Sequence, residues 1–182
     1  MGKRHDSFSA DLQAWLAQQK VFFIATAPLG ADGHLNCSPK GGDTFRILND
    51  GEVAYLDLTG SGVETIAHLQ ENGRIVFMFC AFEDPPRIVR LHGRGEVVYP
   101  RDPTYLELSR RFPNHPGARA IIRVRLKRIS DSCGFGVPLL DFVGDRDALE
   151  RWAEKKDPSG LTDYRREKNH TSIDRLPGYH ET

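Results

Sequence analysis

Charge of one sign and long apolar runs are both missing from this 182-residue sequence. Lysine plus arginine equal aspartate plus glutamate at 25 each, so no net charge draws the chain to nucleic acid or to an anionic membrane. No apolar run reaches the length of about 20 residues that a membrane-spanning helix needs. The first residues also lack the apolar stretch and small-residue cleavage site of a secretory signal. We therefore expect neither a nucleic-acid nor a membrane partner.

Cysteine and the common catalytic motifs are also scarce. Cys37, Cys80 and Cys133 are odd in number and widely spaced, which favours reduced thiols in a cytoplasm over disulfide bonds or a zinc site. The seven histidines form no H-x-x-x-H pair and no cluster with carboxylates. The sequence has no G-x-S-x-G, no Walker loop and no G-x-G-x-x-G after a strand. If the protein is an enzyme, we expect a bound organic cofactor to carry the chemistry.

The most informative stretch that is present covers residues 53–79. Glu52–Leu58 is apolar and aromatic, as in a strand, and runs into the flexible, hydroxyl-rich turn Thr59-Gly60-Ser61-Gly62. A short helix and another strand, Arg74–Ala81, are expected to follow. Free backbone N–H groups at the start of such a helix suit a phosphate group. The stretch therefore predicts a strand, a phosphate-sized turn, a helix and a strand.

Ser61 and Glu64 have the S-x-x-E spacing of a capping box. This spacing predicts a helix that begins at Gly62 and ends at Asn72-Gly73. The alternative to a phosphate site is an ordinary strand-to-helix turn, in which Ser61 serves as an N-cap that stabilises the helix by about 1 kcal/mol.

The rest of the chain alternates between short apolar segments and turn residues. Arg87–Val97 places Val89 and Leu91 on one face, and its Gly93 and Gly95 predict a bulge or a close backbone contact. The other expected strands are Val21–Ala27, His34–Ser38, Thr44–Leu48 and Ala120–Ile129. One expected helix runs from Ser7 or Ser9 through Gln19, a short second one follows Pro103, and a third runs from Asp145 through Lys156. A polar surface tail is expected from Asp157.

These six or seven strands are joined mostly by short, hairpin-like links, which favour antiparallel pairing. A doubly wound parallel fold would need strands that alternate regularly with longer helices. A partly closed antiparallel barrel with two or three inserted helices therefore fits the pattern better.

Three sequence strings carry a resemblance to a known family. They are NCSPKGGDTF over Asn36–Phe45, YLDLTGSGVETIAHLQENGRIVFMF over Tyr55–Phe79, and PPRIVRLHGRGEV over Pro85–Val97. With this order of elements the sequence resembles the pyridoxamine 5'-phosphate oxidase-related proteins, which are flavin-binding split barrels. The resemblance implies a mainly β fold, a six-stranded antiparallel Greek-key barrel. It also implies a homodimer with FMN at the subunit interface.

The resemblance also implies one domain over residues 1–182, with a core of about 20–145 and a C-terminal helix and surface tail over 146–182. Lys40, followed by Gly41, takes the place of the arginine that holds the cofactor phosphate, and lysine can serve as a point charge there. The backbone of Thr44 and Phe45 then lines the ring system. Further implied cofactor contacts come from Thr59, Gly60, Ser61, Gly62 and, late in the chain, Ser132 of Asp131-Ser132.

One departure from the family concerns the start of the helix. Glu64-Thr65 replaces an Arg-Lys pair that serves the phosphate in the oxidase, and a carboxylate there repels a phosphate. The positive charge must then come from Lys40 and from Arg90 or Arg94. An equally simple interpretation is that Arg90 is a solvent-exposed residue without a ligand, because a basic face is common on an exposed antiparallel sheet.

The resulting hypothesis is a cytoplasmic FMN-binding oxidoreductase that passes hydride through the flavin to or from a small-molecule substrate of unknown identity. No side chain is expected to act as a nucleophile. Two alternatives stay open: a flavin- or haem-binding sensor or carrier without turnover, and a deazaflavin-dependent reductase, because one fold of this kind hosts several chemistries.

Overall fold

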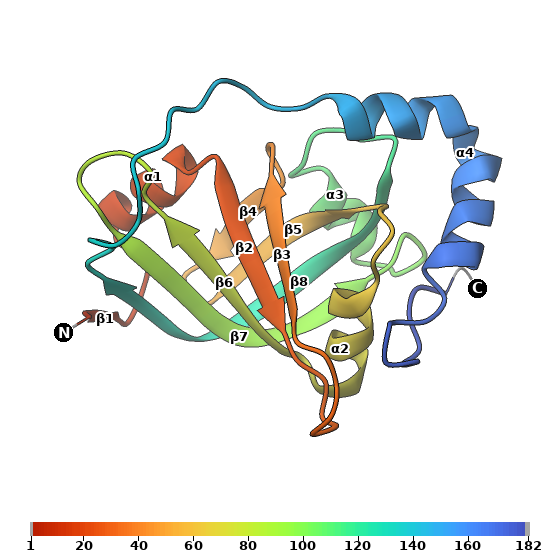
Figure 1. Cartoon of the computed structure of the whole chain (residues 1–182), viewed down its shortest axis with the longest axis horizontal. Coiled ribbons are helices and arrows are strands. Elements are labelled where there is room, and N and C mark those ends of the chain that lie inside the picture. The colour runs from red at the N-terminus through yellow and green to blue at the C-terminus, as the bar shows by residue number, and fades with distance from the viewer. Residues whose placement is uncertain (1, 181–182) are drawn as a thin grey trace.

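A curled antiparallel sheet forms the body of the protein in the computed structural model, which describes residues 2–180 (Figure 1). The strands in this range are β1 (Arg4–His5), β2 (Val21–Thr26), β3 (Asn36–Gly41), β4 (Phe45–Asn49), β5 (Glu52–Leu58), β6 (Arg74–Cys80), β7 (Ile88–Val98) and β8 (Ala118–Ser132). The helices are α1 (Ala10–Gln18), α2 (Glu64–Asn72), α3 (Tyr105–Ser109) and α4 (Ala148–Lys168).

The strands follow the order β3-β2-β6-β7-β8-β5-β4, with the short β1 beside β8. Along β2, buried and partly exposed residues alternate, because successive side chains of a strand point to opposite faces. The inner face encloses a core in which Tyr55, Phe77 and Ile122 are fully buried. This arrangement confirms the predicted antiparallel split barrel, although the described residues contain eight strands where six or seven were expected.

A bulge interrupts the pairing of β7 with β8 between His92 and Gly93, as the glycines in this strand predicted. A Cβ atom built on Gly93 would lie 2.5 Å from the Arg125 carbonyl oxygen, a backbone atom that cannot move aside cheaply. Glycine is therefore required where the two backbones approach closely.

Gly93→Ala should lower the free energy of unfolding by about 1–3 kcal/mol, as overpacking does in other cores. Urea unfolding followed by circular dichroism measures the change. The matched control is Gly136→Ala in an open loop, where an added Cβ would meet nothing within 4 Å. Equal stabilities for the two variants would contradict the close-approach explanation.

The first helix begins as predicted at Ser9, whose hydroxyl accepts a hydrogen bond from the Leu12 N–H at 3.2 Å. Leu12 and Leu16 then point into the core. Across residues 2–180, no helix is both long enough and apolar enough to cross a bilayer.

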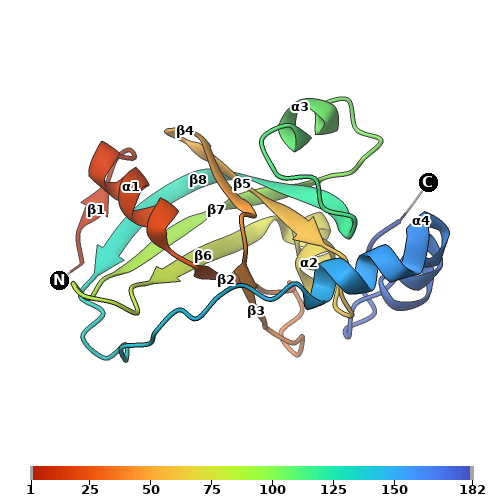
Figure 2. The same ribbon diagram turned by 90° about the horizontal axis from the view of Figure 1, so that it is seen from above.

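The C-terminal part of the chain differs from the prediction. The helix expected to end at Lys156 continues through a kink at Asp157 to Lys168. The Asp157 carboxylate accepts from the Gly160 N–H at 2.8 Å, so Asp157 caps a second helical segment that opens with Pro158. Beyond this kink Arg165 and Asn169 are buried, since they donate hydrogen bonds to Thr59 and Gly60. Figure 2 shows α4 at the same end of the molecule as α2. These two residues are part of the packed structure rather than a surface tail.

Candidate functional site

The inner face of edge strand β3 carries three polar side chains. Asn36, Ser38 and Lys40 pair in register with Thr26, Ile24 and Phe22 of β2. Thr26, Ile24 and Phe22 are buried, and directly opposed residues share a face of the sheet. The predicted phosphate ligand Lys40 therefore points to the inside of the split barrel.

Asn36 ties the β3 edge to helix α2. Its Nδ2 donates to the hydroxyl oxygens of Thr26 at 3.1 Å and Thr65 at 3.0 Å. Thr26 also lies 2.9 Å from Nδ1 of His68, whose pKa is lowered by burial. These contacts fix the start of α2 against the open edge of the sheet.

Lys40 lies beside a buried carboxylate at the end of β5. Its Nζ is 3.6 Å from Oδ1 of Asp57, which is completely buried, whereas a quarter of the Lys40 side chain is exposed. Arg119 holds the other oxygen of Asp57 at 2.6 Å. Burial by itself would raise the pKa of Asp57, but the charges of Arg119 and Lys40 outweigh it and lower the pKa below its ordinary value. Asp57 is therefore a carboxylate at neutral pH.

Side chains from β8 and from the C-terminal region form hydrogen bonds with the turn Thr59–Gly62. Arg119 donates to the Gly62 carbonyl at 3.0 Å and to Oδ1 of Asn169 at 2.9 Å. Asn169 in turn donates to the Gly60 carbonyl at 2.8 Å. Arg165 donates to the Thr59 hydroxyl at 2.9 Å. The turn thus has a fixed shape, set by residues that follow it by about 60 to 110 positions.

Ser61 is not the N-cap that the capping-box spacing predicted. Helix α2 begins at Glu64, and Val63 in the N-cap position makes no side-chain cap hydrogen bond. The Glu64 carboxylate instead accepts from the Val63 N–H at 3.0 Å and from the Ile173 N–H at 3.3 Å. Because Arg119 and Asn169 hold the turn, the helix starts two residues later than expected, and Ser61 is exposed.

Two cations share the buried carboxylate of Asp57, two residues before the turn. Arg119 lies 2.6 Å from one carboxylate oxygen, and Lys40 lies 3.6 Å from the other. Arg119 is 3% exposed, whereas a quarter of the Lys40 side chain is exposed. Of these two cations, Lys40 is therefore the one that an anion from solvent can approach.

A cavity of about 480 Å³ lies between α1 and β4 on the same inner face. Phe22, Phe45 and Phe79 line it, with ring centroids 5.0–5.6 Å apart. Thr44, next to Phe45, donates its hydroxyl to the Gly41 carbonyl at 2.9 Å. The structure therefore brings Gly41, Thr44 and Phe45 to one end of the inner face, next to Lys40.

Arg90 and Ser132 lie on the outer face of the sheet. Arg90 donates to the Ser132 hydroxyl at 3.1 Å, so these two predicted residues meet each other. Arg90 is opposite Met78, which is opposite Phe23, and these outer-face side chains are partly exposed. In one copy of the chain the sheet separates this pair from Lys40.

Comparison with known proteins identifies the family. The model for pyridoxamine 5'-phosphate oxidase matches residues 8–133, more than half of the chain. The chain belongs to the pyridoxamine 5'-phosphate oxidase family. It is also 41% identical over 193 residues to the pyridoxamine 5'-phosphate oxidase family protein ustO of Aspergillus flavus, and the match covers 97% of this chain and 77% of that protein. The resemblance stated from the sequence is thus confirmed.

Solved structures show the same fold at low sequence identity. A Lactobacillus delbrueckii protein assigned to the pyridoxamine 5'-phosphate oxidases has a TM-score of 0.55 at 16% identity, covering 70% of this chain and 98% of that chain. An FAD-binding protein of Mesorhizobium loti has a TM-score of 0.50 at 15% identity, covering 72% of this chain and 96% of that chain. At these identities the likeness concerns the fold alone.

Proposed function

We propose that this member of the family is a cytoplasmic, FMN-binding oxidoreductase that acts on a small organic substrate as a homodimer. The observation that carries the proposal is the pair of cations at Asp57, two residues before the turn Thr59–Gly62, with Lys40 as the exposed one. The fold accommodates a flavin nucleotide in the Mesorhizobium loti protein.

The residues at the turn fit a cofactor phosphate. Lys40 supplies a charge-assisted donor, and the exposed Ser61 and Gly62 add hydroxyl and backbone donors at the start of α2. Asp57 does not cancel this charge, because Arg119 already pairs with it at 2.6 Å. Glu64 is turned to the N–H groups of Val63 and Ile173. We infer that Lys40 is the main phosphate contact.

The cavity beside Phe45 fits a planar ring system. Its volume of about 480 Å³ lies in the range of about 300–1,000 Å³ that small-molecule sites occupy. Phe22 lines it and also pairs in register with Lys40, so the cavity and the ammonium group share one face. A bound flavin supplies hydride transfer there. The chain binds the phosphate, packs the ring against the cluster of phenylalanines and excludes water from it.

The homodimer part of the proposal rests on the position of Arg90 and Ser132. These residues cannot reach a ligand held by Lys40 in the same copy, because the sheet lies between them. Phe23 of β2 and Met78 of β6 lie on the same face of the sheet as Arg90, and both are partly exposed. A second copy packed on this face brings its own inner site toward the Arg90–Ser132 pair.

The test is the visible absorption spectrum of the purified protein, with titrations of FMN, FAD, a deazaflavin and haem, and light scattering for the molar mass. A dimer that binds FMN and oxidises a reduced nicotinamide in steady state supports the proposal. FMN binding without any turnover identifies a sensor or carrier instead. Preference for haem or a deazaflavin, or failure to bind any of the four ligands, overturns it.

Lys40→Ala should weaken FMN binding about 10- to 100-fold, since hydrogen bonds to charged groups contribute about 1.5–3 kcal/mol. Lys40→Arg should retain most of the affinity. Fluorescence titration of the apoprotein measures both, and Lys155→Ala on the exposed side of α4 is the matched charge-removal control. If Lys40→Ala binds FMN as tightly as that control, Lys40 does not hold the phosphate.

A further inference from the structure

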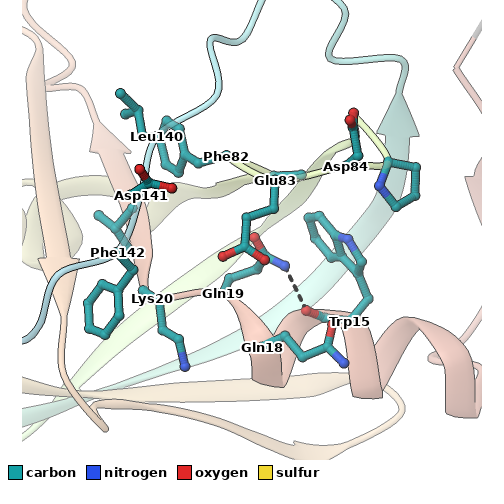
Figure 3. A pocket seen from close by; sticks show the side chains of 13 residues that line it. Trp15, Gln18, Gln19, Lys20, Phe82, Glu83, Asp84, Leu140, Asp141 and Phe142 are labelled. Carbon is teal, nitrogen blue, oxygen red and sulfur yellow. Dashed lines mark hydrogen bonds between the residues drawn. The ribbon is translucent and has the colours of Figure 1, made fainter.

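A second cavity, of about 330 Å³, lies where α1 joins β2 (Figure 3). Residues of the loop after β6, including Phe82 and Glu83, form one side of it. The segment of residues 133–147, which connects β8 to α4, forms another side through Leu140 and Phe142. The Leu140 N–H donates to the Phe82 carbonyl at 3.0 Å, and this bond holds the segment against the loop.

The walls of this cavity are largely aromatic. Trp15, Phe82 and Phe142 come from three separate parts of the chain and are all partly or well exposed. Arg87 lies 5.1 Å from the Trp15 ring centroid, which is within the range of a cation–π contact. Gln19 donates to the Trp15 carbonyl at 2.9 Å and fixes the end of α1.

The charge inside the cavity is negative. Figure 3 shows the carboxylates of Glu83 and Asp141 directed toward its middle, with Asp84 at the far rim. Within residues 2–180 none of these three carboxylates forms an ion pair. The Lys20 ammonium group, 5.4 Å from the Phe142 ring centroid, points away from Glu83 and Asp141. The cavity therefore combines aromatic walls with carboxylates that lack a cation.

We propose that this cavity binds a small organic cation, an amine or quaternary ammonium group attached to a flat apolar body. The aromatic rings attract a cation and cover the apolar body, and the carboxylates of Glu83 and Asp141 supply the opposite charge. An anion of the same shape is repelled by the carboxylates, and a neutral molecule gains no charge attraction from them.

The site is separate from the proposed flavin site. Of the two sets of lining residues, only Gln19 belongs to both cavities. Leu140, Asp141 and Phe142 follow residue 133, where the match to the family model ends. The cation site is therefore built in part by a segment outside the matched region, and it does not depend on the proposed cofactor.

Titration of Trp15 fluorescence tests the proposal, in a Trp152→Phe background that leaves Trp15 as the single tryptophan. The probes are benzyltrimethylammonium, benzyl alcohol and benzenesulfonate, which share an aromatic body and differ in charge. We expect saturable binding of the cation at least tenfold tighter than of the alcohol, with no binding of the sulfonate. Calorimetry with the unmodified chain, with and without FMN, should give the same order of affinities.

Glu83→Gln with Asp141→Asn removes both charges at nearly constant volume and should weaken cation binding at least tenfold. Asp145→Asn, in the same connecting segment but not in the cavity wall, is the matched control. Glu83→Gln alone serves if the double variant does not fold. Equal affinities for the cation and the alcohol, or an unchanged affinity in the variants, would overturn the proposal whether or not FMN binds.

Discussion

Replacing Arg119 with methionine should lower the free energy of unfolding by about 3–5 kcal/mol, the usual cost of leaving a buried charge without its partner. Asp57 is completely buried, and its short contact is the 2.6 Å bond to Arg119. Lys40 remains, but at 3.6 Å. For a domain of this size the melting temperature should fall by about 6–20 °C. Urea unfolding at pH 7 measures the loss, and a change below about 1 kcal/mol would contradict it.

The loss of stability in Arg119→Met should depend on pH. The pKa of Asp57 is lowered in the folded protein, so its contribution to stability is present above its ordinary pKa of about 4 and is lost as pH falls. In Arg119→Met, the charge of Arg119 no longer offsets burial, so the pKa of Asp57 should rise. The difference in free energy of unfolding between the unmodified protein and Arg119→Met should therefore become smaller at acid pH. Asp57→Asn combined with Arg119→Met should recover part of the loss, because the unpaired charge is then gone.

Asn169→Leu should lower the free energy of unfolding by about 2–3 kcal/mol. The two side chains are similar in size, but leucine cannot form the two hydrogen bonds that Asn169 makes at this fully buried position. The Gly60 carbonyl would lose the donor that lies at 2.8 Å, and Arg119 would lose an acceptor at 2.9 Å. The turn Thr59–Gly62 should loosen as a result. Chemical unfolding gives the magnitude, and hydrogen exchange of the residues in the turn reports the loosening.

Asn114→Leu is the control for this change, because Asn114 is exposed and surface substitutions usually stay within about 0.5 kcal/mol. If Asn169→Leu is as stable as Asn114→Leu, the C-terminal region does not hold the turn. If stability falls but exchange in the turn is unchanged, the contact stabilises α4 alone.

Both substitutions concern residues that the sequence did not single out. Arg119 immediately precedes the expected strand Ala120–Ile129 and belongs to none of the motifs in the sequence. A shift in the pairing of β5 with β8 between Asp57 and Leu58 changes which residues of β8 face inward at this point. Arg165 and Asn169 lie in a polar segment without periodic apolar residues, so nothing in the local pattern predicts burial.

Local patterns, by contrast, predicted five strands to within one residue, whereas β3 and β8 differ from the expected bounds by two or three residues and β1 was not expected. Glu52–Leu58 has the predicted bounds, Ser9 caps α1, and the glycines of β7 mark a bulge. Each of these features depends on neighbours in the sequence: the alternation of side chains, the free N–H groups of a helix start, and the space that glycine leaves. Ser61 and Glu64 do not form the predicted capping box, because the Glu64 carboxylate accepts hydrogen bonds from the N–H groups of Val63 and Ile173.

The sequence by itself determined the antiparallel barrel, the family and the grouping of Lys40 with Gly41, Thr44 and Phe45, because these follow from short-range patterns and from motifs. Only the tertiary structure decided that Lys40 faces the buried pair of Asp57 and Arg119, and that Arg90 lies on the opposite face. It also decided that α4 supports the turn Thr59–Gly62. The reason is physical: a buried charge must find its partner in space, and that partner can lie anywhere along the chain.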